Sequence, residues 1–283
     1  MTVVVVTDSS ASLPADLVAD LGVLTVPLHV LVDDHEFRDG VDEFEIDYSS
    51  SSVTTSASSP GELRAAYERA WELSEGDGVV AVHLSRQLSG TWEAGRQAVR
   101  DMDAANRVRL VDSLSAGLGT GLTVLAAARR ARAGAELDVV YDTAVAASVR
   151  GRAFIVVNRT EQLRRGGRLS SAAAFFGTEL VTKPILQIVD GRIELREKAR
   201  TRSKAFTKLV AAVVDAAGED GAAVAVQHLG AEEAANTIAG QLRDLIPGIR
   251  ELIVAEFGPT LGVHLGMGAV GALVVPGGCG AEA

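Results

Sequence analysis

The sequence has one cysteine, few aromatic residues and no long apolar run, and each deficit excludes a class of protein. Cys279 is the only cysteine among 283 residues, so no internal disulfide can form and a reducing compartment is expected. Aromatic residues make up 4% of the chain and hydrophobic residues 47%, which indicates a core of alanine, valine and leucine. No apolar run reaches the ~18 residues of a membrane helix. We therefore expect a soluble, cytoplasmic protein with no stable membrane insertion.

Basic residues are also scarce, and they are unevenly placed. The net charge of -10 argues against binding to nucleic acid or to anionic membranes. Residues 158 to 208 nevertheless hold twelve basic and five acidic side chains, a net charge of +7, and include every lysine of the chain. Such a segment is usually a plain solvated face. Within an acidic chain it also favours a docking patch for a phosphate or an acidic partner.

Motifs of the common catalytic chemistries are missing. None of the five histidines is paired with another at i,i+4 and Cys279 lies in a glycine-rich tail, so no metal site and no cofactor are expected. The chain has neither the GxSxG elbow of serine hydrolases nor the GxxxxGK[ST] phosphate loop. Ser89 and His264 could still act as nucleophile and base. An enzyme of acyl or phosphoryl transfer therefore stays open as the alternative.

What is present is an alternation of strand-like and helix-like segments. Apolar strands that end in Asp, Ser or Gly and alternate with helical patterns predict a parallel α/β sheet. Further along the chain, two strand-like runs flank Asp190-Gly191 and predict a hairpin. The sequence thus predicts an α/β protein of two domains, an N-terminal parallel-sheet domain over residues 1–157 and a C-terminal mixed-sheet domain over residues 158–278 with helices on one face.

The stretch Val79–Thr91 is the most informative for function. An apolar strand leads into a loop with Ser89, Gly90 and Thr91, after which a helical pattern begins. Hydroxyls and unpaired N–H groups at a helix start, together with the helix dipole, favour an anion. The alternative is that Ser89 only caps the helix. Because parallel strands end at one edge of a sheet, Thr7-Asp8-Ser9 and Asp112-Ser113 are expected on the same rim.

Two further segments stand out. Gly258–Gly271 has five glycines around His264, which predicts a loop where backbone comes close to a neighbour, or else a tight interdomain turn with a structural histidine. Glu43–Ser59 is polar and predicts a surface loop, within which Thr54-Thr55-Ser56 is a cluster of hydroxyls.

Together these segments resemble the DegV family of fatty-acid-binding proteins, the lipid carriers of bacterial fatty acid kinase. The resemblance runs almost end to end and is carried by these matches: Thr7-Asp8-Ser9-Ser10, Thr54-Thr55-Ser56, Leu88-Ser89-Gly90-Thr91, Asp112-Ser113, Gly166-Gly167-Arg168-Leu169-Ser170, Lys183-Pro184-Ile185-Leu186, Asp190-Gly191, Lys198-Ala199-Arg200 and Gly262-Val263-His264. The chain departs from the usual family residues at Ala57, Arg86, Trp92, Val263, Leu265 and Met267.

The resemblance implies two α/β domains with a long-chain fatty acid between them, its tail buried in a tunnel. It implies a non-catalytic carrier that presents the carboxylate to a separate kinase for acyl-phosphate formation. The residues implied to hold or adjoin the carboxylate are Thr55 or its neighbour Thr54, Ser89, the Gly90 amide and His264. Those implied to face the kinase and its phosphate are Arg168, Lys198 and Arg200.

Overall fold

The structure is a computed structural model that describes residues 2–280 apart from residues 34, 51, 103–105 and 170–181. Ser170 of the predicted motif and Glu179 of the basic segment lie outside the described residues. Within the described part, one sheet is parallel and has the strand order β2–β1–β6–β7. Its strands are β1 (Val4–Asp8), β2 (Leu24–Val26), β6 (Val79–His83) and β7 (Val108–Asp112).

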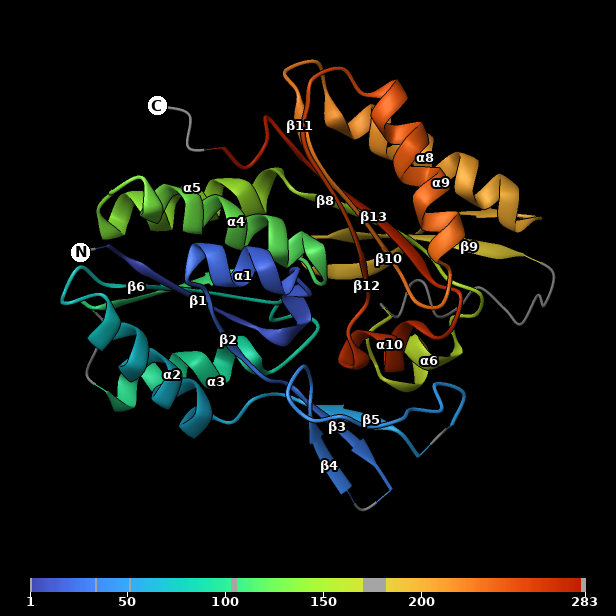
Figure 1. The fold of residues 1–283 in the computed structure, drawn as a ribbon. Helices are drawn as coiled ribbons and strands as arrows, with labels where there is room; N and C mark the ends of the chain where they lie inside the picture. The colour runs from blue at the N-terminus through green and yellow to red at the C-terminus, as the bar shows by residue number, and fades with distance from the viewer. Residues whose placement is uncertain (1, 34, 51, 103–105, 170–181, 281–283) are drawn as a thin grey trace.

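Helices cover both faces of this parallel sheet (Figure 1). Strands β1 and β6 consist almost wholly of buried apolar residues, as expected for strands with helices on either side. One face packs against α4 and α5, the other against α2 and α3. The helices of this half are η1 (Ser9–Ala11), α1 (Ala15–Leu21), α2 (Pro60–Leu73), α3 (Thr91–Asp101), α4 (Leu118–Arg132) and α5 (Leu137–Arg150).

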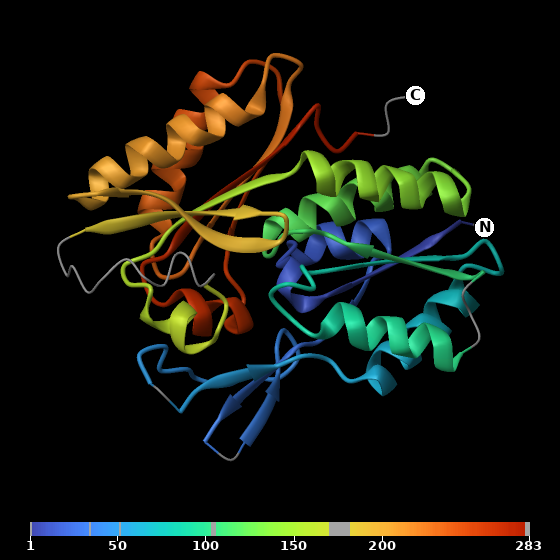
Figure 2. The same ribbon diagram turned by 180° about the vertical axis from the view of Figure 1, so that it is seen from behind.

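A mixed sheet forms the other half, with the order β10–β9–β8–β13–β11–β12 over the residues described. Its outer face packs on α8 and α9, and its inner face contacts α4 (Figures 1 and 2). The elements are β8 (Arg152–Val156), β9 (Lys183–Val189), β10 (Arg192–Ala199), α8 (Arg202–Ala217), β11 (Ala222–His228), α9 (Glu232–Leu245), β12 (Ile249–Glu256) and β13 (Val270–Pro276).

A small antiparallel sheet and two short helices lie beside the junction of the two halves (Figure 1). The small sheet has the order β4–β3–β5, with β3 (His29–Val32), β4 (His35–Arg38) and β5 (Thr54–Ser56). The helices are α6 (Glu161–Arg165) and α10 (Pro259–Leu265). Val263 of α10 packs with Val30 and Val53, which joins this helix to the small sheet.

The fold class predicted from the sequence is confirmed: a parallel and a mixed sheet in one α/β chain, with α8 and α9 on one face of the mixed sheet. The hairpin at Asp190-Gly191 is also confirmed, since both residues have positive φ and join β9 to β10. Strand β8 pairs within the mixed sheet although it precedes residue 158. The division at 157/158 stays a prediction.

Pro27 divides the apolar stretch Leu24–Val32 into two strands that belong to different sheets. Two local predictions were wrong. The polar segment Glu43–Ser59 contains β5, which pairs with β3. The glycine-dense segment around His264 is mainly helix α10: Pro259 starts it, Gly266 ends it with φ 75°, and Gly262 is needed because a Cβ there would lie 2.5 Å from the Tyr48 ring.

Candidate functional site

A buried chain of side chains fixes the ends of β1 and β6. Asp8 Oδ2 accepts hydrogen bonds from the Leu84 amide and from His83 Nδ1, both at 3.0 Å. The Tyr67 hydroxyl lies 2.7 Å from Nε2, the other ring nitrogen of His83. Burial raises the pKa of Tyr67, so its hydroxyl stays protonated. None of the three side chains is exposed to solvent.

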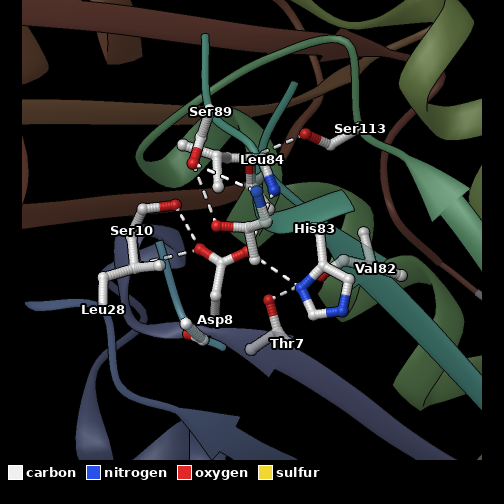
Figure 3. Close-up of polar contacts among 12 residues, drawn as sticks. Thr7, Asp8, Ser10, Leu28, Val82, His83, Leu84, Ser89 and Ser113 are labelled. Atoms are coloured by element: carbon white, nitrogen blue, oxygen red, sulfur yellow. Dashed lines mark hydrogen bonds and ion pairs between the residues drawn. The ribbon is translucent and has the colours of Figure 1, made fainter. Parts of the chain in front are cut away.

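This buried chain confirms that the predicted rim forms. Figure 3 shows Asp8, His83, Leu84, Ser89 and Ser113 gathered where neighbouring strands end. The Ser113 amide donates to the His83 carbonyl at 3.0 Å, which ties β7 to the same edge. The loop that carries Ser89 therefore leaves from a rigid strand end.

The loop 85–91 is held on both sides. The Ser85 hydroxyl donates to the Gly191 carbonyl at 2.9 Å, so the β9–β10 hairpin is attached to the loop. Ser89 Oγ lies 2.9 Å from Thr91 Oγ1 and accepts a weak bond from the Thr91 amide at 3.3 Å. The N-cap of α3 is Gly90, with no side-chain cap hydrogen bond, so the alternative in which Ser89 caps the helix was wrong. Ser89 lines a pocket, together with Gly90.

Thr55 and His264 are in contact with each other in the wall of this pocket. Thr55 Oγ1 lies 2.8 Å from His264 Nε2, and both residues line the pocket. Burial, and then the charges of Arg168 and Arg165, lower the pKa of His264 to about 4. The imidazole is therefore neutral at neutral pH. Thr54, its neighbour on β5, is exposed and is not part of the pocket wall.

The pocket has a polar end and an apolar floor. Its empty volume, including the part open to solvent, is about 870 Å³. Hydroxyl, amide and imidazole groups lie at one end, from Thr55, Ser56, Ser89, Gly90 and His264. Paired residues of the mixed sheet form the floor: Ile193 opposite Ile188, Ile188 opposite Ala153, Ala153 opposite Leu273, and Ile155 opposite Gly271. Such a pocket suits an amphipathic ligand with an apolar chain.

The three predicted phosphate-facing residues are separated. Arg168 lines the pocket, and its Nε donates to the Leu88 carbonyl at 3.2 Å. Lys198 belongs to β10 and the exposed Arg200 follows that strand, and neither is part of the pocket wall. Arg168 therefore belongs to the pocket wall, apart from Lys198 and Arg200.

Ser89 and His264 bond to other residues, with Thr91 at Ser89 and Thr55 at His264. Among the described residues they do not form a nucleophile–base pair with each other. Nor do any three His, Cys, Asp or Glu side chains described here form a group that could hold a metal ion. None of the described helices is long and apolar enough to cross a membrane.

Sequence reasoning missed several residues of this site. Thr260 is buried in the pocket wall one helical turn before His264, a spacing that would have been informative had α10 been predicted. The link from Asp8 to Tyr67 had no local signal, since the residues come from β1, β6 and α2. Of the departures from the family pattern, Ala57 and Leu265 line the pocket. Arg86 lies over the Trp92 ring and pairs with Asp112 at 3.3 Å.

The fold and the pocket define a two-domain α/β protein with an apolar pocket that is polar at one end. The sequence matches the family described as "Uncharacterised protein, DegV family" over residues 2–277, and the chain belongs to the DegV family. A DegV domain-containing protein of Mycobacterium tuberculosis is 46% identical over 274 residues, which cover 97% of each chain.

Two solved structures resemble this fold closely. A DegV family protein from Thermus thermophilus, described by its fatty acid binding, superposes with a TM-score of 0.89 at 31% identity and covers 98% of this chain and 100% of its own. DegV of Bacillus subtilis, described as a fatty acid binding protein, gives a TM-score of 0.84 at 32% identity and covers 97% of this chain and 99% of its own.

Proposed function

We propose that this protein binds a long-chain fatty acid and presents its carboxylate to a separate fatty acid kinase. The observation that carries the proposal is the pocket, in which hydroxyls and a neutral imidazole at one end adjoin an apolar floor. The fatty acid binding described for the Thermus thermophilus and Bacillus subtilis relatives supports it.

The carboxylate is held by the hydroxyls of Thr55 and Ser89 and by the Gly90 amide, with His264 beside it. Neutral donors of this kind leave the carboxylate oxygens able to react. Arg168, at the wall, adds positive charge, and its Nε and Nη1 donate to the Leu88 and Gly166 carbonyls. The chain then lies along the sheet floor in a buried tunnel between the two halves.

The affinity comes mainly from the acyl chain of the fatty acid. Each buried methylene contributes about 0.8 kcal/mol, so a dozen contribute about 10 kcal/mol. Association costs several kcal/mol, which leaves enough for tight binding. The head group sets orientation, so that the carboxylate lies at the pocket end where Thr55 and Ser89 are found.

After the fatty acid is bound, the kinase carries out the phosphoryl transfer. A carboxylate oxygen attacks the phosphorus of a phosphoryl donor held by the kinase. The bond from that phosphorus to the bridging oxygen of the donor breaks, so the acyl phosphate forms and the rest of the donor leaves with the electron pair. This protein supplies no nucleophile of its own. Lys198 and Arg200 provide part of the docking face, and Arg168 lies between that face and the carboxylate. The net charge of the segment 158 to 208 supports this assignment.

The direct test is native mass spectrometry of the purified protein, followed by extraction and identification of the bound molecule. A co-purified mass in the range of a fatty acid supports the carrier. The alternative is an acyl or phosphoryl transferase that uses Ser89 and His264. Protein that is empty and hydrolyses activated acyl esters, and that loses this activity in Ser89→Ala, supports the enzyme and overturns the carrier.

A further inference from the structure

A second, smaller cavity borders the main pocket at Leu273 of β13. Leu273 is the only described residue that lines both cavities. We propose that Leu273 is the end-stop that sets the length of acyl chain the pocket accepts. This inference rests on the proposed fatty acid binding.

The two cavities lie in line along the inner face of the mixed sheet. On β13, Gly271 lines only the main pocket, Leu273 lines both, and Val275 lines only the small cavity. Alternate residues of a strand share a face, so the three side-chain positions follow one another along a single track. The track runs away from α10, which carries His264 and precedes β13.

A neighbouring strand gives the same order. Near β8, Ile155 and Ala153 line the main pocket, and Gly151 lines the small cavity. The segment that leads into α4 borders both cavities, with Gly117 on the main pocket and Ser113, Ser115 and Gly119 on the small cavity. The two strands thus place the small cavity as a continuation of the acyl floor.

Leu273 fills the gap between sheet and helix. It is 3% exposed, and a Cβ on Gly119 would lie only 3.0 Å from its Cδ2. The isobutyl group therefore reaches from β13 to the backbone of α4. The residue opposite Leu273 on β8 is the small Ala153, so that position leaves the space beside Leu273 open.

The small cavity is not a ligand site on its own. It has room for no more than about one water molecule. Two of its hydroxyls already have partners, since Thr123 donates to the Gly119 carbonyl and Ser148 to the Val145 carbonyl. It is spare volume, which a chain reaches only when the Leu273 side chain is shortened.

Shortening Leu273 should lengthen the preferred ligand. Leucine exceeds alanine by three carbon atoms, so the shortened side chain leaves room for about two to four carbons of the acyl chain. Each methylene that enters it should tighten binding by about fourfold. Leu273→Ala should therefore shift the affinity optimum toward longer fatty acids, whereas the wild type rejects them.

The test is a competition titration with saturated fatty acids that differ by two carbons, against a fluorescent fatty acid. Leu273→Ala is compared with Leu242→Ala, which removes a fully buried leucine from α9 on the other side of the sheet. Leu273→Val serves as a milder truncation if Leu273→Ala does not fold. An optimum shifted to longer chains in a Leu273 variant and unchanged in Leu242→Ala supports the end-stop.

An unchanged optimum in both Leu273 variants overturns the end-stop while leaving the proposed function in place. Equal weakening across all lengths in Leu273→Ala and Leu242→Ala also overturns it, because Leu273 would then act only in packing. Wild-type protein that binds no fatty acid of any length overturns the proposed function instead.

Discussion

Thr55 Oγ1 and His264 Nε2 lie 2.8 Å apart although 209 positions separate the two residues in the chain. The contact depends on α10 packing against the small sheet, through Val263 against Val30 and Val53. With the pKa of His264 lowered to about 4, the pair is neutral at neutral pH. It can therefore share hydrogen bonds with a carboxylate without burying a permanent positive charge.

Thr55→Val should weaken fatty acid binding by about 10- to 100-fold, because loss of one hydrogen bond to a charged group costs about 1.5–3 kcal/mol. Valine keeps the shape of threonine, so the fold should be retained, with some loss of stability because the contact with His264 Nε2 is removed. The measurement is titration with a fluorescent fatty acid. Thr54→Val is the matched control, since Thr54 is exposed and lies outside the pocket wall. Equal effects in the two variants would remove Thr55 from the binding site.

Ser89→Ala should weaken binding by a similar factor, since it removes a second hydroxyl from the polar end of the pocket. A small loss of stability is expected too, because Ser89 Oγ accepts from the Thr91 amide at 3.3 Å. Titration and thermal melting of the same sample separate the two effects. Binding that is unchanged while the melting temperature falls would leave Ser89 with a structural role alone.

Acidification should destabilise the protein through His264. Its pKa is about 4 in the folded protein and about 6.5 unfolded. Below pH 6.5 the unfolded chain takes up a proton that the folded chain does not, so stability is intact above 6.5 and is lost progressively as pH falls to 4. The loss is at most about 3 kcal/mol from this group.

Denaturant unfolding of wild type and His264→Gln at several pH values measures this contribution. The difference in unfolding free energy between the two proteins should change between pH 6.5 and 4 and be constant above 6.5. His35→Gln, which removes an exposed histidine, should show no such change. A pH-independent difference for His264→Gln would mean that the folded imidazole titrates normally.

The architecture was more predictable than the site. Strand patterns, the hairpin at Asp190-Gly191 and the loop around Ser89 follow from local sequence, and these were confirmed in the structure. Helix α10 was predicted as a loop because of its glycines. In the structure these glycines allow close packing or lie at the ends of the helix, and the sequence does not show which neighbour comes close. The Gly262 contact with Tyr48 is such a case.

Long-range contacts could not be predicted from the sequence for the same reason. The pairing of Thr55 with His264, and of Tyr67 with His83, each depends on how separate elements pack. The choice of Thr55 over Thr54 follows only once β5 is placed beside the pocket, which Thr55 lines and Thr54 does not. Hydrophobic periodicity cannot predict which of the two residues faces the pocket, because this polar segment has no alternation of apolar residues.

Arg168→Ala and Arg200→Ala should act differently. Arg168 lines the pocket and holds the Leu88 carbonyl, so its loss should weaken fatty acid binding and acyl-phosphate formation together. Arg200 is exposed outside the pocket, so its loss should reduce only acyl-phosphate formation with a cognate kinase. The Arg200 effect should shrink at high salt, since exposed charges are screened within about 8–10 Å. Fatty acid affinity lost in Arg200→Ala would contradict the docking assignment.

Tyr67→Phe should destabilise the protein by about 1–3 kcal/mol without changing fatty acid affinity, because it leaves the fully buried His83 Nε2 with no hydrogen-bond partner. Neither Tyr67 nor His83 lines the pocket, so a binding loss at preserved stability would contradict a purely structural role. Tyr141→Phe is the control, because Tyr141 lies half-buried on α5. Urea unfolding with unchanged m-values measures the stability of both variants.

Asp8 also accepts a hydrogen bond from the Leu84 amide. A loss of stability near 3 kcal/mol in Tyr67→Phe would therefore mean that Asp8, His83 and Tyr67 act as one unit. That unit would fix the end of β6, from which the Ser89 loop leaves.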